Sequence, residues 1–350
     1  MRTVLSPDAP SFRDGASLIA VALASLCLAA PAAGDYSPPR TAEGHPDLSG
    51  VWDFRTLTPL ERPEDQQAFL SPEQAQDIEA KADAVSAAQH APSDPDRPPP
   101  PEGDATPYNA FWFDHGARVS GDRRSSLLID PPDGRLPPTQ PGVKRQVMGD
   151  DQPEDSPVRL LVGGVGAADP ESRGLAERCI VGFNAGPPIW PGGYNQNLKI
   201  VHAPGYVVVF MEMVHEARII PTDGRGRPPM DIRPWTGSSL GRWEGDTLVV
   251  ETANFPGKRS SFAPTPFQSV GTAEHMRLTE RFSLVADDTL RYEYTVDDPA
   301  TYTRPFTVAQ QMRKSEEQIY EYACHEGNYG LRNILTGARM QEKLAAAGSE

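Results

Sequence analysis

The chain has 350 residues, of which 38% are hydrophobic and 23% charged, so it has enough apolar material for a folded core. It contains 37 prolines, about a tenth of the chain against an average of roughly 5%, which argues against a helical bundle because interior prolines break helices. The formal net charge of −15 disfavours nucleic acid and anionic membranes as partners, since both attract basic surfaces.

The first 33 residues have the pattern of a secretory signal peptide. Two arginines precede an apolar run over 16–30, and a zone of small residues that suits cleavage ends at Ala33. The run is too short to span a membrane, and Leu26 before Cys27 is too large for the usual lipoprotein cleavage box. The sequence therefore predicts an exported protein, periplasmic or secreted, without a membrane anchor.

Cys179 and Cys324 are the two cysteines that remain after removal of the signal peptide. An even pair in an exported protein predicts a disulfide, which would close a loop of about 145 residues. Two free thiols are the alternative. A metal pair is disfavoured because neither cysteine belongs to a CxxC motif.

Residues 34–120 are expected to form an N-terminal extension. Residues 48–54 have the pattern of a short strand, and a Ser-Pro-Glu-Gln capping box starts a helix over 71–89. The proline-rich segment 91–103 then predicts a stiff, exposed linker.

Residues 121–350 are expected to form an all-β domain of mainly antiparallel strands. A hairpin arm over 125–130 with a Pro-Pro-Asp-Gly turn comes first. Residues 289–296 alternate between apolar and polar side chains, which is typical of a half-buried strand. Nine strands with short connections predict a meander that closes into a barrel able to hold one small ligand, followed by a helix over 331–347. The expected strands are 198–202, 206–213, 215–221, 238–243, 246–252, 275–285, 289–296, 304–313 and 318–324.

The Gly50-Val-Trp52 sequence resembles the Gly-x-Trp motif of lipocalin-like (calycin) barrels, in which the Trp plugs the closed end. The resemblance implies a lipocalin-like meander barrel, although lipocalins have no long insertion after the first strand. Longer strings are similar to a large uncharacterised family of secreted bacterial proteins, namely GHPDLSGVW, GRWEGDTLVV and EYACHEGNYGL. Because that family has no assigned activity, it implies an exported β-rich protein and no particular reaction.

The sequence lacks the motifs of zinc proteases, α/β-hydrolases and nucleotide-binding enzymes, so no cofactor is expected. Its most informative cluster is Glu212, His215 and Arg218. Glu212 lies in an expected strand that is apolar on both faces, so its carboxylate must be paired or have a raised pKa. The three residues form either a structural ion pair or an acid/base group in a cavity.

A second polar group follows Cys324 and contains His325 and Tyr329. It is either a plain polar turn or part of a site at the barrel mouth, where polar groups are expected. The predicted disulfide would bring it close to a Gly/Pro-rich loop that carries three further candidates for substrate binding, Asn184, Tyr194 and Asn195.

Three more candidates for substrate binding, Trp112, Asp114 and Arg118, would form either a lid or ordinary packing. His202, His215 and His275 would bind zinc only if the fold brought them together, so no metal is expected.

Two classes of function remain open. The first is an exported acid/base lyase, isomerase or hydrolase for a small organic molecule, with Glu212 or His215 as base and Arg218 or Tyr329 stabilising negative charge. The second is a non-catalytic binder or carrier of a small apolar or aromatic molecule. An enzyme requires Glu212, His215 and a loop group to converge, whereas a carrier requires an apolar cavity elsewhere. The concentration of polar residues favours the enzyme slightly.

Overall fold

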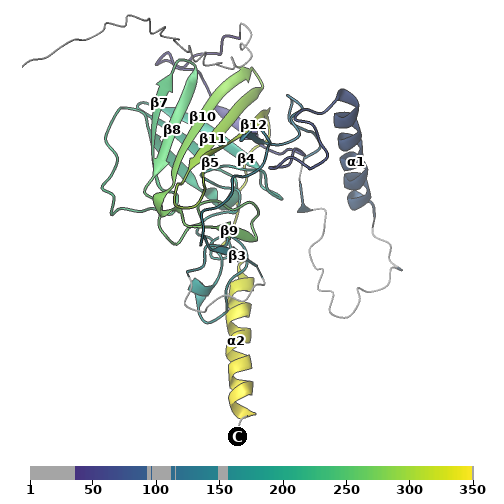
Figure 1. Cartoon of the computed structure of the whole chain (residues 1–350), viewed down its shortest axis with the longest axis vertical. Helices are drawn as coiled ribbons and strands as arrows, with labels where there is room; N and C mark the ends of the chain where they lie inside the picture. The colour runs from purple at the N-terminus through teal and green to yellow at the C-terminus, as the bar shows by residue number, and fades with distance from the viewer. Residues whose placement is uncertain (1–35, 93–95, 97–111, 115, 149–156, 349–350) are drawn as a thin grey trace, which may run out of the picture. The chain divides into compact units, whose positions relative to one another are not determined.

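The computed structural model describes residues 36–92, 96, 112–114, 116–148 and 157–348 (Figure 1). The expected signal peptide and most of the expected linker over 91–103 lie outside the described residues. Within the described part of the chain, no helix has the length and apolar character needed to cross a membrane. Residues 36–350 form one compact unit.

Ten strands form one antiparallel sheet, which confirms the predicted all-β class. Their bounds are β1 Gly50–Asp53, β2 Leu128–Asp130, β4 Asn197–Ala203, β5 Tyr206–Met211, β6 Ala217–Pro221, β7 Ser238–Glu244, β8 Thr247–Ala253, β10 Arg277–Ala286, β11 Thr289–Asp297 and β12 Phe306–Ser315. The order is β6-β5-β4-β1-β12-β11-β10-β8-β7, and β2 pairs with β12 off this path. Figure 1 shows β7, β8, β10 and β11 side by side. A separate two-stranded sheet joins β3, Arg145–Val147, to β9, Gln268–Val270.

The large sheet curls until its two edge strands face each other. A Cβ atom added to Gly241 of β7 would lie 3.0 Å from side-chain carbons of both Ile220 and Thr222, at the end of β6. No hydrogen-bonded ladder joins β6 to β7, both of which are described in full. The sheet is therefore a barrel whose last seam is closed by side-chain packing.

Side chains fill the inside of this barrel. The alternation predicted for 289–296 is confirmed in β11, because Leu290, Tyr292, Tyr294 and Val296 are each at most 1% exposed. Inward residues of the other strands, such as Phe282, are equally buried. The interior is therefore mainly a packed core.

The strand predicted at 48–54 lies in the middle of the sheet. β1 pairs with β4 on one side and with β12 on the other. Trp52 is 1% exposed, and its indole Nε1 donates a hydrogen bond of 2.9 Å to the carbonyl of Leu48. A short strand from the expected N-terminal extension thus completes the sheet.

The strand predicted over 318–324 does not form, because β1 occupies the position beside β12. This segment is instead held by the backbone N–H of Tyr322, which donates a hydrogen bond of 2.8 Å to Nε2 of His215. The turn predicted at 131–134 forms, since the N–H of Gly134 donates to the carbonyl of Pro131 at 3.0 Å, but the hairpin does not, because β2 pairs with β12.

Both predicted helices are present. Helix α1, Pro72–His90, has the expected capping box: Gln74 N–H donates to Ser71 Oγ at 3.2 Å, and Ser71 N–H donates to Gln74 Oε1 at 2.8 Å. Helix α2, Tyr329–Ala347, has no buried residue. Within the described residues, short 3₁₀ helices cover Pro170–Ser172, Met213–His215 and Ala273–His275.

Candidate functional site

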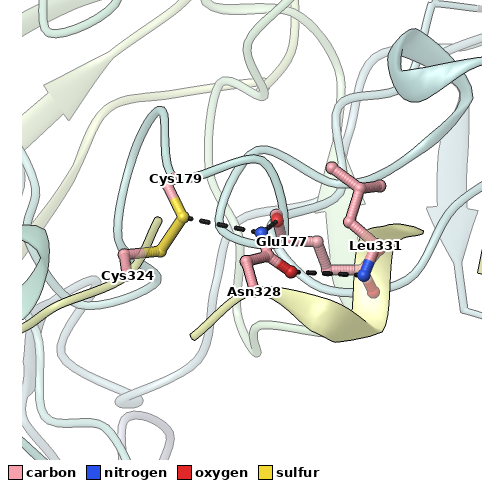
Figure 2. Close-up of a disulfide and its surroundings, with 5 residues drawn as sticks. All are labelled: Glu177, Cys179, Cys324, Asn328 and Leu331. Atoms are coloured by element: carbon pink, nitrogen blue, oxygen red, sulfur yellow. Dashed lines mark hydrogen bonds between the residues drawn. A yellow bond between two sulfur atoms is a disulfide. The ribbon is translucent and has the colours of Figure 1, made fainter. Parts of the chain in front are cut away.

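The predicted disulfide between Cys179 and Cys324 is confirmed, with the two Cα atoms 5.9 Å apart. Figure 2 shows Asn328 beside it. Nδ2 of Asn328 donates a hydrogen bond of 2.7 Å to the carbonyl of Glu177, and its Oδ1 accepts one of 3.2 Å from the N–H of Leu331. The disulfide and Asn328 together attach the start of α2 to the loop that contains Cys179.

The disulfide brings two predicted loops to one cleft of about 500 Å³, whose walls include Tyr194, Tyr322 and Asn328. His325 is exposed and Tyr329 is 67% exposed, and neither belongs to the lining of this cleft.

Another candidate in this region, Asn184, has a structural role. Asn184 is fully buried, and its Nδ2 donates to the carbonyls of Tyr194 and Asn195 at 3.0 and 3.2 Å. Of the candidates predicted around the disulfide, Tyr194 alone lines the cleft.

Glu212, His215 and Arg218 each contact a different partner. Glu212 Oε2 accepts hydrogen bonds from the N–H and Nδ2 of Asn197 at 3.2 and 2.9 Å. His215 Nε2 accepts from Tyr322, as described above, and its ring stacks on Phe210 with centroids 5.8 Å apart.

Glu212 does not pair with Arg218, one of the alternatives that the sequence left open, because β5 ends at Met211 and Glu212 lies at the start of a tight turn. Val214 and His215 have φ values of 59° and 53° in this turn, which reverses the chain before β6. The turn therefore separates the glutamate from the inward face on which Arg218 lies.

Arg218 forms a buried ion pair inside the barrel with Glu280 of β10. Its Nη1 and Nη2 donate to Glu280 Oε2 and Oε1 at 2.7 and 2.9 Å, and neither residue is more than 7% exposed. The hydroxyl of Tyr292 donates to the same Oε1 at 2.8 Å and accepts at 3.0 Å from the N–H of Ile189. Burial raises the pKa of Tyr292 well above 10, so its hydroxyl stays protonated.

The candidates Asp114 and Arg118 line a polar groove of about 290 Å³ between α1 and β12. Asp114 forms an ion pair with Arg55, and Arg118 forms one of 3.3 Å with Asp83 of α1. Trp112 is 59% exposed and is not part of this lining.

A pocket that the sequence did not indicate lies between the loops before β4 and after β8. This arginine pocket is small, with a cavity volume of about 30 Å³. Its polar lining consists of Arg159, Arg259, Ser260 and Ser261, and its apolar lining includes Leu161, Val181, Phe183, Trp190 and Phe262.

Arg259 is 9% exposed, and its hydrogen bonds go to backbone carbonyls. Nη1 donates to Trp235 at 2.8 Å, and Nη2 donates to Pro187 at 2.7 Å. Burial lowers the pKa of Arg259 to about 10, an effect that the nearby Glu216 partly offsets, so the guanidinium is still charged at pH 7. Burial also raises the pKa of the Glu216 carboxyl.

Arg159 has a single side-chain hydrogen bond, from Nε to the carbonyl of Gly257 at 2.9 Å. Burial lowers its pKa as well. Neither Arg159 nor Arg259 forms an ion pair with any carboxylate of the described residues. The pocket is therefore lined by two cations without direct counter-charges.

A second, largely apolar pocket of about 330 Å³ shares two lining residues, Trp190 and Phe262, with the arginine pocket. Its other walls include Leu57, Leu60, Leu127 and Tyr294. Together the two pockets offer an apolar surface with a cationic end.

Among the described residues, no group of three or more His, Cys, Asp and Glu side chains could hold a metal ion. His202 and His215 use Nε2 to accept hydrogen bonds from the backbone N–H groups of Leu48 and Tyr322.

No protein-family model matches the chain, and no curated protein matches its sequence. The chemistry of the site is accordingly argued from its own side chains.

Proposed function

We propose that the protein binds a small molecule with an apolar or aromatic body in the two adjoining pockets. The observation that carries this proposal is the pair of aromatic side chains, Trp190 and Phe262, that line both pockets. Ligand pockets in proteins typically have volumes of about 300–1,000 Å³ and mainly apolar walls. The apolar pocket, at about 330 Å³, lies in this range, and the arginine pocket, at about 30 Å³, adds room for one small polar group of the ligand.

Binding is favoured over acid/base catalysis by Glu212, His215 and Arg218 because each of these side chains already has its own partner. Glu212 contacts Asn197, His215 contacts Tyr322, and Arg218 contacts Glu280. Because these three side chains contact separate partners and do not converge on one spot, they support a carrier better than an enzyme that uses them as its acid/base group.

An acid/base enzyme is the second candidate, and Glu216 is the observation that favours it. The carboxyl has a raised pKa beside the pocket residue Arg259, and raised pKa values are common among catalytic acids. A metabolite screen for turnover by the mature protein, repeated with Glu216→Gln, tests this candidate.

We also propose that the protein functions outside the cytoplasm. The Cys179–Cys324 disulfide supports an oxidising compartment, since such bonds are rare in reducing ones. The signal-peptide pattern of residues 1–33 is consistent with the same location.

A titration of the mature protein with N-phenyl-1-naphthylamine, a neutral aromatic fluorophore, tests the binding proposal. We expect saturable binding that Trp190→Ala weakens about 10-fold or more, because a buried aromatic contact is lost. The control is Tyr320→Ala, which removes an aromatic side chain that is 74% exposed and lines neither pocket. Failure to bind, or equal affinity of the wild type and Trp190→Ala, would contradict the proposal.

A further inference from the structure

We infer that the arginine pocket is an anion site, and that it takes the carboxylate of an organic acid whose apolar body lies against Trp190 and Phe262. The inference rests on the proposed function, because it names the chemical class of ligand for the same pair of pockets. It follows from charge, hydrogen-bond capacity and the position of the apolar walls.

The first argument is the charge inside the pocket. Two well-buried arginines elsewhere in the described chain pair with carboxylates, in Arg218–Glu280 and Arg173–Glu177, whereas the half-buried Arg227 donates only to backbone carbonyls. Arg159 and Arg259 have none within ion-pair distance, and burial without an opposite charge costs several kcal/mol per ion. A bound anion would supply the missing charge.

The second argument is the unused donors. A guanidinium has five N–H donors in a planar fork, and Arg159 donates to described residues only through Nε. Its two terminal amino groups therefore have four N–H bonds available. That fork matches the two oxygens of a carboxylate, which guanidinium groups bind in a bidentate manner.

Ser261 gives independent evidence for a polar ligand. This residue is 2% exposed and lines the pocket, yet its Oγ has no hydrogen-bond partner among the described residues. The neighbouring Ser260 differs, because its Oγ donates to the carbonyls of Phe262 and Val270. A buried hydroxyl without a partner costs about 1–3 kcal/mol, which a ligand oxygen would offset.

The walls indicate that the anion is part of a larger organic molecule. Phe183, Trp190 and Phe262 line the pocket beside its cationic end, and the apolar pocket continues beyond Trp190 and Phe262. An inorganic ion would leave this surface uncovered, whereas a neutral aromatic molecule would leave the arginine donors unpaired. The net charge of −15 also disfavours multiply charged anions relative to a single carboxylate.

The test compares 2-naphthoate with the neutral 2-naphthamide by isothermal titration calorimetry on the mature protein at pH 7. We expect the acid to bind at least 10-fold more tightly than the amide. Arg159→Gln should remove that preference by weakening the acid while leaving the amide unchanged. Arg159 is replaced in preference to Arg259 because it is less buried. The second variant, Ser261→Ala, should weaken the affinity for the acid several-fold.

The matched control is Arg135→Gln, which removes a surface arginine whose side chain is 40% exposed and which lines neither pocket. It should leave both affinities unchanged. If the amide binds as well as the acid, or if Arg159→Gln keeps the preference, the anion site is refuted while the proposed function stands. If inorganic phosphate binds more tightly than naphthoate, the organic acid is the wrong ligand class. If N-phenyl-1-naphthylamine, naphthoate and naphthamide all fail to bind, both proposals fail.

Discussion

Glu280→Gln is expected to be one of the most destabilising single substitutions in the barrel. The glutamine keeps the shape of the side chain but removes the negative charge that faces the buried Arg218. One oxygen remains to accept from Tyr292 and Nη2 of Arg218, while the other becomes an NH₂ group that points at Nη1. Two N–H donors then face each other, and the positive charge of Arg218 has no counter-charge.

The size of the effect follows from these contacts. One charged hydrogen bond is lost, worth about 1.5–3 kcal/mol, and the remaining cation is buried without a counter-charge. Removal of one partner from a buried ion pair typically costs about 3–5 kcal/mol, and we expect a loss of unfolding free energy in that range. The exposed Glu251 pairs with Arg242 at 2.6 Å, so Glu251→Gln is the matched control and should cost less than about 1 kcal/mol.

Urea denaturation followed by tryptophan fluorescence measures both variants. The double variant Arg218→Met/Glu280→Gln removes the cation as well, and it should be more stable than Glu280→Gln alone. The reasoning would be refuted by a loss of unfolding free energy below about 1 kcal/mol for Glu280→Gln. It would also be refuted if the loss for the double variant equalled the sum of the losses for Glu280→Gln and Arg218→Met measured singly.

Three further substitutions test other features. Cys179→Ser/Cys324→Ser opens a loop with a sequence separation of 145, which in the chain-entropy model costs about 5 kcal/mol in urea denaturation. Burial raises the pKa of Glu216 above its ordinary value of 4.5. Between pH 4.5 and the raised pKa, the native state therefore binds more protons than the unfolded state, and the unfolding free energy of the wild type should fall as pH rises through that window. Glu216→Gln should remove this fall, which urea denaturation at several pH values would detect. Ser71→Ala removes the cap of α1 and should cost about 1 kcal/mol locally, seen as faster amide exchange in α1 with unchanged exchange in β11.

Local patterns in the sequence predicted those parts of the fold that depend on neighbouring residues. The alternation over 289–296 identified the inward face of β11, and the capping box identified the start of α1. The position of β1 between β4 and β12 could not be predicted in this way, because its partners lie far along the chain. For the same reason the composition of segment 318–324 predicts a strand after β12, although β1 occupies the position beside β12.

The site shows the same limit. Closeness in sequence suggests Glu212 as a partner for Arg218, whereas its partner in the structure, Glu280, lies on a strand 62 residues away. The available signal was a glutamate between Leu278 and Phe282, at an inward position of an alternating strand. Arg159 and Arg259 lie in irregular loops without periodicity, so their convergence becomes visible only in three dimensions.

The central position of β1 has a consequence for biosynthesis. The ribosome makes Val51 early, but its partner Ser315 is among the last residues of the sheet to emerge. β4 emerges earlier and can pair with one edge of β1, but until β12 is made the other edge of β1 lacks its partner, and unpaired strand edges are templates for aggregation. The nascent chain therefore gains from chaperones that keep it extended, and a truncated product that ends before β12 is expected to be insoluble rather than a smaller folded domain.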